Sequence, residues 1–173
     1  MKHLFFMSFI GLLLLTSVAC QAQPDKSNRP SPAATATQKV GDVTITINYS
    51  QPSVKGRTIG KDLEPKDGKV WRTGANEATV FEVDKDVKVE GKALPAGKYG
   101  LFTLVNGDDW TIIFNKTWNQ WGAFNYKEDD DALRVTVKAG KADPFAEKFT
   151  ITISEAGAVT FMWGDRKVEF EVK

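Results

Sequence analysis

The chain has 173 residues, with 23 lysines and arginines against 22 aspartates and glutamates, one histidine and one cysteine. This near-neutral balance argues against the basic surfaces that bind nucleic acid or anionic membranes. A lone cysteine excludes an internal disulfide, and the only histidine, His3, lies in a leader that we expect to be removed. Ser-His-Asp and Cys-His catalysis and ordinary zinc or copper sites are therefore excluded from the expected mature domain.

Residues 1–19 have the form of a secretory signal peptide, with a basic start and an apolar run too short to span a membrane comfortably. Small residues then lead to Cys20, in an ending that resembles a bacterial lipobox, whose cysteine is acylated and becomes the mature N-terminus. Ser17 stands where leucine is usual, and ordinary cleavage after Ala22 is the alternative. The sequence predicts a lipoprotein of the cell envelope, anchored in the membrane and facing the periplasm or the exterior; a secreted soluble protein is the alternative.

Residues 20–38 are rich in Pro, Ser, Ala, Thr, Asn and Gln. Such a segment has too little apolar surface to offset the entropy of ordering, which predicts a flexible tether. The remainder, residues 40–173, has a normal size for a single domain with one core.

Apolar and polar residues alternate along most of this domain, which is the period of a β-strand. The alternation is clear in Val43–Tyr49, Thr79–Val83, Val87–Val89, Leu133–Val137, Phe149–Ile153, Val159–Trp163 and Val168–Val172. We expect the last two to be joined by a hairpin at Gly164-Asp165.

Two runs, Tyr99–Val105 and Trp110–Phe114, are apolar on both faces, which predicts central strands joined by the "NGDD" turn at residues 106–109. No segment of the domain keeps a period of 3.6 residues, so we expect no helix longer than about two turns. The prediction is an all-β domain, an antiparallel β-sandwich of jelly-roll or immunoglobulin-like type, with a barrel as the alternative.

Carboxylates are the main acid–base groups left for catalysis. Glu77 would need a second carboxylate at the separation that glycosidases use, and the sequence identifies none. The run Glu128–Asp131 fits no calcium loop and is interpreted as a solvated loop. No metal or cofactor is predicted, and catalysis is the less favoured interpretation.

Two segments are chemically richer than ordinary loops: "WRTGANEAT" (71–79) and "NKTWNQWGAFNY" (115–126). Aromatic faces beside amide groups are typical of pockets for sugars and other amphipathic small molecules. The alternative is that the aromatic side chains cover a sheet edge while the amides satisfy backbone groups. The candidate ligand-binding residues are Arg72, Asn76, Glu77, Asn115, Trp118, Asn119, Trp121 and Tyr126.

These segments, together with "VKVEGKALPAGKYGLFT" and the flanking residues of each, resemble a family of secreted bacterial proteins catalogued as domain of unknown function 2911. The resemblance runs from about Val40 to Lys138 and onward. It implies an exported single domain, often lipid-anchored or joined to other modules, with no assigned activity. Lys66-Asp67 depart from the Pro-Tyr-Gly usual at this place, which puts any role of that tyrosine in doubt. The signature positions implied are Arg72, Asn76, Glu77, Asn115, Trp118, Asn119 and Trp121.

We expect the two segments to meet in space, with Arg72 paired to Glu77 and the indole of Trp118 or Trp121 over the guanidinium. Non-catalytic binding of a small molecule or glycan is the favoured function. A structural or protein-interaction module of the cell envelope and a carboxylate-based hydrolase are the alternatives.

Overall fold

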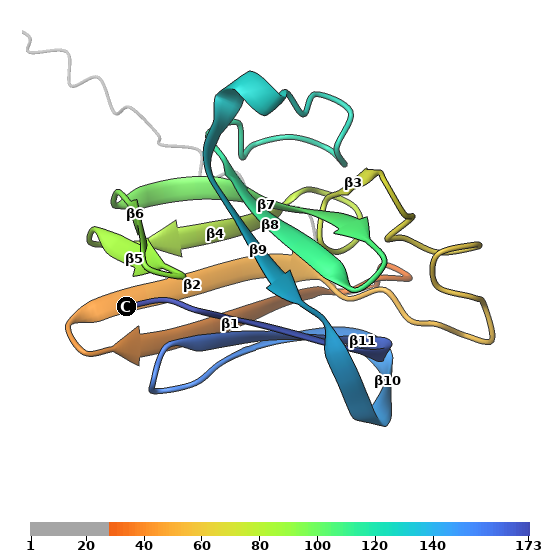
Figure 1. Cartoon of the computed structure of the whole chain (residues 1–173). Coiled ribbons are helices and arrows are strands. Elements are labelled where there is room, and N and C mark those ends of the chain that lie inside the picture. The colour runs from red at the N-terminus through yellow and green to blue at the C-terminus, as the bar shows by residue number, and fades with distance from the viewer. Residues whose placement is uncertain (1–27) are drawn as a thin grey trace, which may run out of the picture.

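The structure, a computed structural model, describes residues 28–173 (Figure 1). The predicted signal peptide, Cys20 and the first part of the predicted tether lie outside these residues. Within them, the one helical element is the three-residue 3-10 turn η1, and no helix could cross a membrane. The strands are β1 (Ala33–Val40), β2 (Val43–Ser50), β3 (Val70–Trp71), β4 (Thr79–Val83), β5 (Val87–Val89), β6 (Lys92–Leu94), β7 (Gly97–Asn106), β8 (Asp109–Asn115), β9 (Asp131–Lys138), β10 (Gly140–Ile153) and β11 (Ala158–Glu171), with η1 at Glu128–Asp130.

The strands form an antiparallel β-sandwich. The main sheet has the order β1-β2-β4-β7-β8-β9, and β3 is paired to β7. The long β10–β11 hairpin is a second layer, which contacts β1 and β9 at opposite edges of the main sheet (Figure 1). A short β5–β6 hairpin completes the set. The main sheet is open, so the predicted all-β sandwich is confirmed and the barrel alternative is wrong.

The principal core lies between the two layers and is largely aromatic. Phe114 of β8 meets Phe170 of β11 with 6.1 Å between ring centroids, and Trp71 of β3 meets Phe149 of β10 at 5.1 Å. Both pairs are edge-to-face, the arrangement that aromatic quadrupoles favour. The alternating burial of β2 and β4 directs Ile45, Ile47 and Phe81 into the same core, as the sequence pattern predicts.

The opposite face of β7 and β8 has its own small core. Phe102, Ile113 and Ala78 are buried there, beneath Ala123 and Tyr126 of the loop that connects β8 to β9. This explains why both strands are apolar on both faces. The "NGDD" turn between them is confirmed by the pairing of Asn106 with Asp109.

Two predictions are wrong. The tether was expected to reach residue 38, but residues 33–40 form β1, which pairs with β2 along its whole length. Its inward positions are Ala34, Ala36, Gln38 and Val40, and of these Ala34, Ala36 and Val40 pack against the core. An edge strand needs only one apolar face and one ladder of backbone hydrogen bonds, so a composition typical of a linker is sufficient here.

The hairpin predicted at Gly164-Asp165 is also absent, because β11 continues through both residues. Gly164 has φ of 61° and pairs with Ala146, with a shift of register on either side along β10. A glycine in the left-handed region is common in a β-bulge, where it bends a strand without reversing it. The sequence thus indicated irregular backbone at Gly164 correctly, but the irregularity is a bulge within one strand and not a hairpin.

Candidate functional site

The two signature segments lie side by side, as expected. The backbone N–H of Ala78 donates to the carbonyl of Gln120 at 3.0 Å, and the N–H of Gly122 donates to the carbonyl of Asn76 at 3.0 Å. Glu77 and Trp121 face each other across this short antiparallel bridge. The backbone thus joins the turn before β4 to the loop after β8.

The turn at residues 71–79 is fixed by internal hydrogen bonds. Trp71 Nε1 donates to the carbonyl of Gly74 at 2.9 Å, and Thr79 Oγ1 donates to the carbonyl of Thr73 at 2.7 Å. A Cβ at position 74 would lie 3.0 Å from Ser50 O and 3.0 Å from Thr79 Oγ1, so only glycine fits without displacement. Trp71 itself is buried in the principal core.

Glu77 is paired to Arg29 and not to Arg72, which corrects the expected ion pair. Arg29 Nη1 lies 2.9 Å from Glu77 Oε1 and 2.8 Å from Oε2. The Arg29 guanidinium also lies 6.0 Å from the ring centroid of Trp121. The expected chemistry of arginine, carboxylate and indole is therefore present, but its arginine comes from the segment assigned to the tether.

Arg72 is not paired to Glu77, and it forms no ion pair with any other residue in 28–173. Its Nε is buried and lacks a hydrogen-bond acceptor within the described part of the chain. Burial lowers the pKa of the Arg72 guanidinium below its ordinary value, and the nearby charge of Glu64 opposes this shift. An arginine held in this way is short of a negative partner, because a desolvated charge is costly unless it is paired.

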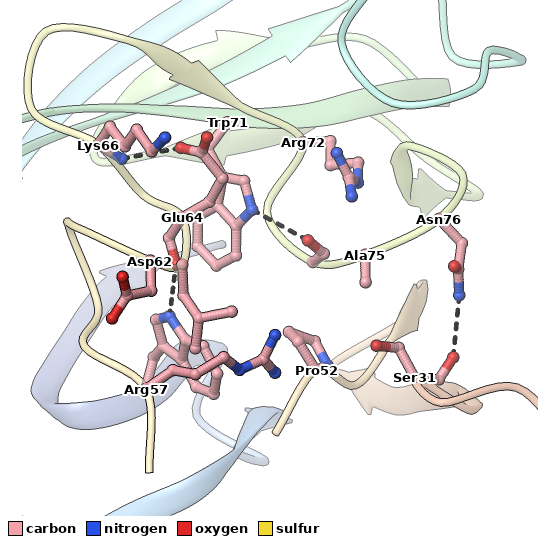
Figure 2. Close-up of a pocket in the computed structure, with 13 residues that line it drawn as sticks. Ser31, Pro52, Arg57, Asp62, Glu64, Lys66, Trp71, Arg72, Ala75 and Asn76 are labelled. Atoms are coloured by element: carbon pink, nitrogen blue, oxygen red, sulfur yellow. Dashed lines mark hydrogen bonds between the residues drawn. The ribbon is translucent and has the colours of Figure 1, made fainter. Parts of the chain in front are cut away.

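A cavity of about 320 Å³ lies beside Arg72 (Figure 2). Arg57 and Lys66 add positive charge to its lining, and Asp62 and Glu64 add negative charge. Both carboxylates accept backbone N–H groups, Asp62 from Thr58 at 3.0 Å and Glu64 from Lys66 at 2.8 Å. The cavity is polar and mixed in charge, with one more cation than anion among these side chains.

The N-terminal segment forms one side of this cavity. Ser31 belongs to the lining, and its carbonyl accepts a hydrogen bond from Asn76 Nδ2 at 2.9 Å (Figure 2). Pro32 O accepts from the backbone N–H of Gln51 at 2.9 Å. Residues 29–32, with the Arg29 contacts already described, are thus bound to the domain at successive points.

A second cavity, of about 250 Å³, adjoins the same residues. Arg72, Trp71 and Glu64 line it as well, and its other side is formed by Val70, Ala123 and Phe124. Arg72 therefore contributes to both cavities. Arg72 is the charged residue of the two segments that can contact a ligand in either cavity.

Three aromatic residues of the loop are exposed: Trp118 by 37%, Trp121 by 55% and Phe124 by 83%. Lys98 Nζ lies 5.7 Å from the centroid of Trp118. The loop beneath them is held by buried Gln120, whose Nε2 donates to Thr117 O at 2.7 Å and whose Oε1 accepts from Asn125 N at 3.2 Å. The aromatic surface is thus built on fixed backbone.

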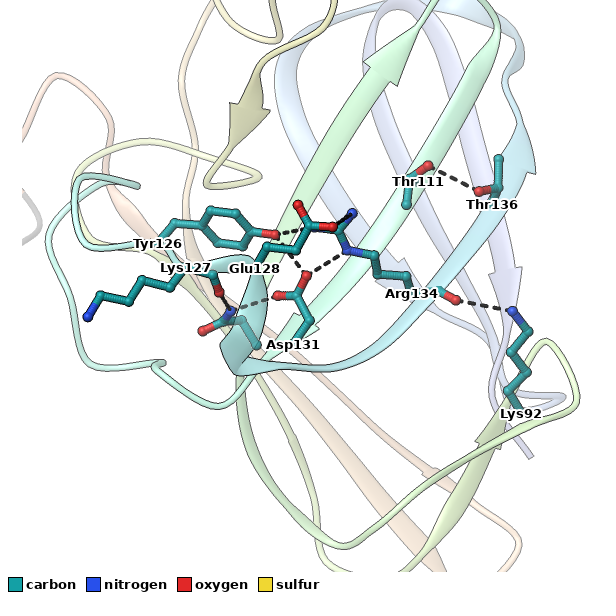
Figure 3. A network of polar contacts seen from close by, with 9 residues as sticks. Lys92, Thr111, Tyr126, Lys127, Glu128, Asp131, Arg134 and Thr136 are labelled. Atoms are coloured by element: carbon teal, nitrogen blue, oxygen red, sulfur yellow. Dashed lines mark hydrogen bonds and ion pairs between the residues drawn. The ribbon is translucent and has the colours of Figure 1, made fainter.

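A polar network anchors the far end of this loop (Figure 3). Asn115, fully buried, donates to Lys127 O at 2.8 Å and to Asp131 Oδ1 at 2.7 Å. Tyr126 Oη donates to Asp131 Oδ2 at 2.8 Å, and Arg134 Nε lies 2.6 Å from the same oxygen. Burial, followed by the hydrogen bond to Asp131, raises the pKa of Tyr126 to about 12.

This network gives the acidic run a structural role. Asp131 and Glu128 both pair with Arg134, and Asp130 accepts from Thr117 Oγ1 at 3.0 Å. The interpretation as a purely solvated loop is therefore incomplete. Among residues 28–173 no cluster of three or more metal-binding side chains occurs.

The eight sequence candidates thus divide by position. Arg72 and Asn76 line the larger cavity, Glu77 and Trp121 hold Arg29, and Trp118 and Asn119 are exposed on the loop. Asn115 and Tyr126 lie in the anchoring network. Sequence reasoning missed the contributions of Arg29, Ser31 and Glu64. Phe124 belongs to the aromatic residues of the second segment but was not among the eight candidates. In the sequence, Glu64 was marked only by its closeness to Lys66-Asp67, where the chain departs from the Pro-Tyr-Gly usual in the family.

Comparison with known proteins gives one finding. The model of the family described as "Protein of unknown function (DUF2911)" matches residues 31–172. No curated protein and no solved structure matches the chain. The match covers almost the whole described domain, including β1 and both signature segments, and the chain therefore belongs to the DUF2911 family.

Proposed function

We propose that the domain binds a small molecule or glycan without catalysis, at the two cavities that share Arg72. The observation that carries this proposal is that Arg72 lines both cavities, while its guanidinium forms no ion pair and no hydrogen bond within residues 28–173. A guanidinium with a purely structural role would normally be paired with a carboxylate or several carbonyls. An oxyanion or carbonyl oxygen of a ligand in either cavity would accept a charge-assisted hydrogen bond from the terminal nitrogens of this guanidinium.

The carboxylates beside Arg72 favour binding over hydrolysis. Asp62 and Glu64 are the acids of the larger cavity, and each already accepts a backbone N–H in a local turn. Such contacts orient a carboxylate as a fixed acceptor for ligand hydroxyl groups. The mixed lining also suits a ligand that carries both an acidic group and donors.

The test is a ligand screen by thermal shift on the mature chain with Cys20→Ser, which keeps the protein free of lipid. A ligand raises the melting temperature by mass action, and we expect small carboxylates and acidic or neutral sugars to include at least one that does so. Arg72→Met should abolish that shift. Arg166→Met is the matched control, because Arg166 is partly exposed and pairs with Asp108 away from both cavities. A shift that persists in Arg72→Met contradicts the proposed site.

We also propose that the protein is an exported lipoprotein anchored to the membrane through Cys20. The proposal rests on the lipobox-like ending of the leader and on the polar segment that follows it. Cys20→Ser should move the protein from the membrane fraction to the soluble fraction of cells that express the full chain. Unchanged membrane association of this variant would rule the anchor out.

A further inference from the structure

We propose that the ligand is an acidic sugar, a pyranose ring that stacks on Phe124 while its carboxylate pairs with Arg72. This inference rests on the proposed binding function and names the class of ligand for it. The smaller cavity, of about 250 Å³, is the place where both contacts are available to one molecule.

The position of Gly122 shows how close the two groups are. A Cβ placed on Gly122 would lie 3.1 Å and 3.2 Å from two atoms of the Phe124 ring, and 3.7 Å from Arg72 Nη1. The Phe124 ring and the Arg72 guanidinium therefore both lie next to Gly122, and both line the smaller cavity. A ligand of the size of a single sugar ring can contact both at once.

Phe124 has the properties of a ligand platform. It is 83% exposed, the most exposed of the large apolar side chains in residues 28–173. Trp118 and Trp121 each have a cation over the ring, from Lys98 and Arg29, whereas no ring pair or cation–ring pair in the described chain involves Phe124. Its backbone is held by the neighbouring Tyr126 N to Ala123 O hydrogen bond at 3.3 Å.

Each wall of the cavity then selects one feature of the ligand. The Phe124 ring favours the apolar C–H face of a pyranose, because amphipathic ligands place such faces on aromatic side chains. Arg72 favours a carboxylate through charge-assisted hydrogen bonds. Glu64, which lines the same cavity, can accept hydrogen bonds from hydroxyl groups. An acidic sugar carries all three features, whereas a neutral sugar lacks the charge and an open-chain sugar acid lacks the ring.

The test uses three probes on the Cys20→Ser chain by isothermal titration calorimetry: trigalacturonate, neutral galactotriose and galactarate, the open-chain diacid. We expect trigalacturonate to bind at least about tenfold more tightly than either of the others. Phe124→Ala should weaken trigalacturonate binding by about tenfold and leave galactarate unchanged. Phe145→Ala is the matched control, since Phe145 is 55% exposed but lines neither cavity. It should change binding by less than about twofold.

The outcomes separate this inference from the function on which it rests. Equal binding of trigalacturonate and galactotriose overturns the acidic class, and an unaffected Phe124→Ala variant overturns the stacking. If another compound of the screen binds through Arg72 while trigalacturonate does not, the acidic-sugar inference is wrong and the proposed function stands. If no compound depends on Arg72, both fail.

Discussion

The guanidinium of Arg29 lies 2.8 Å from Glu77 Oε2 and 6.0 Å from the ring centroid of Trp121. This contact links three parts of the chain: the segment before β1, the turn before β4 and the loop after β8. The carbonyl of Ser31, bound by Asn76, extends it to the rim of the larger cavity. Residues 29–31, which the sequence assigned to the tether, are thus part of the candidate site.

The Arg29–Glu77 pair should contribute little to global stability. Their side chains are 29% and 36% exposed, and pairs this accessible to water are typically worth less than about 1 kcal/mol. A double-mutant cycle with Arg29→Ala and Glu77→Gln, measured by urea unfolding, should give a coupling free energy below this value. High salt should reduce it further. A coupling of about 3 kcal/mol would instead indicate a buried network.

Replacement of Arg72 should be tolerated by the fold. The substitution Arg72→Met removes a desolvated charge whose Nε has no acceptor in residues 28–173 and keeps an unbranched apolar side chain. We expect the free energy of unfolding to stay within about 1 kcal/mol of wild type, or to rise. Chemical denaturation measures this directly. A loss of about 3 kcal/mol would mean that Arg72 is a structural residue, against the proposed function.

Asn115 should be among the costly positions of the second segment. Its side chain is fully buried, donates two hydrogen bonds and accepts another from Thr117 N at 2.9 Å. Asn115→Ala should lower the free energy of unfolding by about 2 to 4 kcal/mol, because several buried partners lose their bonds together. Asn119→Ala, at an exposed position of the same loop, is the control and should cost less than about 0.5 kcal/mol. Equal effects of the two substitutions would contradict the anchoring role.

Tyr126 should make the domain sensitive to alkaline pH. Burial and the hydrogen bond to Asp131 raise the pKa of its phenol to about 12, so the folded protein holds the proton more tightly than the unfolded chain. The resulting stability is fully present below the ordinary tyrosine pKa of about 10 and is lost as pH rises through about 12. Tyr126→Phe, which has no phenol to ionise, lacks this dependence.

The measurement is urea unfolding of the wild-type chain and of Tyr126→Phe at about pH 8 and about pH 11. The stability advantage of the wild type should shrink at the higher pH. A stability advantage of the wild type over Tyr126→Phe that is the same at both pH values would contradict a raised Tyr126 pKa. Ionisation of the other tyrosines cancels in the comparison, because both proteins contain them.

The amino-acid sequence by itself determined the features that neighbouring residues encode. Alternation along Val43–Tyr49 and Thr79–Val83 predicted half-buried strands, and the doubly apolar runs predicted β7 and β8 with a tight turn between them. The composition of the two signature segments was also sufficient to predict that they meet. These inferences succeed because side-chain periodicity and turn chemistry act over a few residues.

Tertiary structure alone decided which groups are partners. Arg29 rather than Arg72 reaches Glu77, because β1 pairs with β2 and brings the segment before it to the turn at residues 71–79. β1 forms because it pairs with β2, although its own composition is typical of a linker. The backbone at Gly164 is a bulge because it pairs with β10, although its local sequence is typical of a hairpin turn. The two cavities arise where segments distant in sequence adjoin Arg72. A charge can be satisfied by any opposite group within a few ångströms, and only the folded chain determines which group that is.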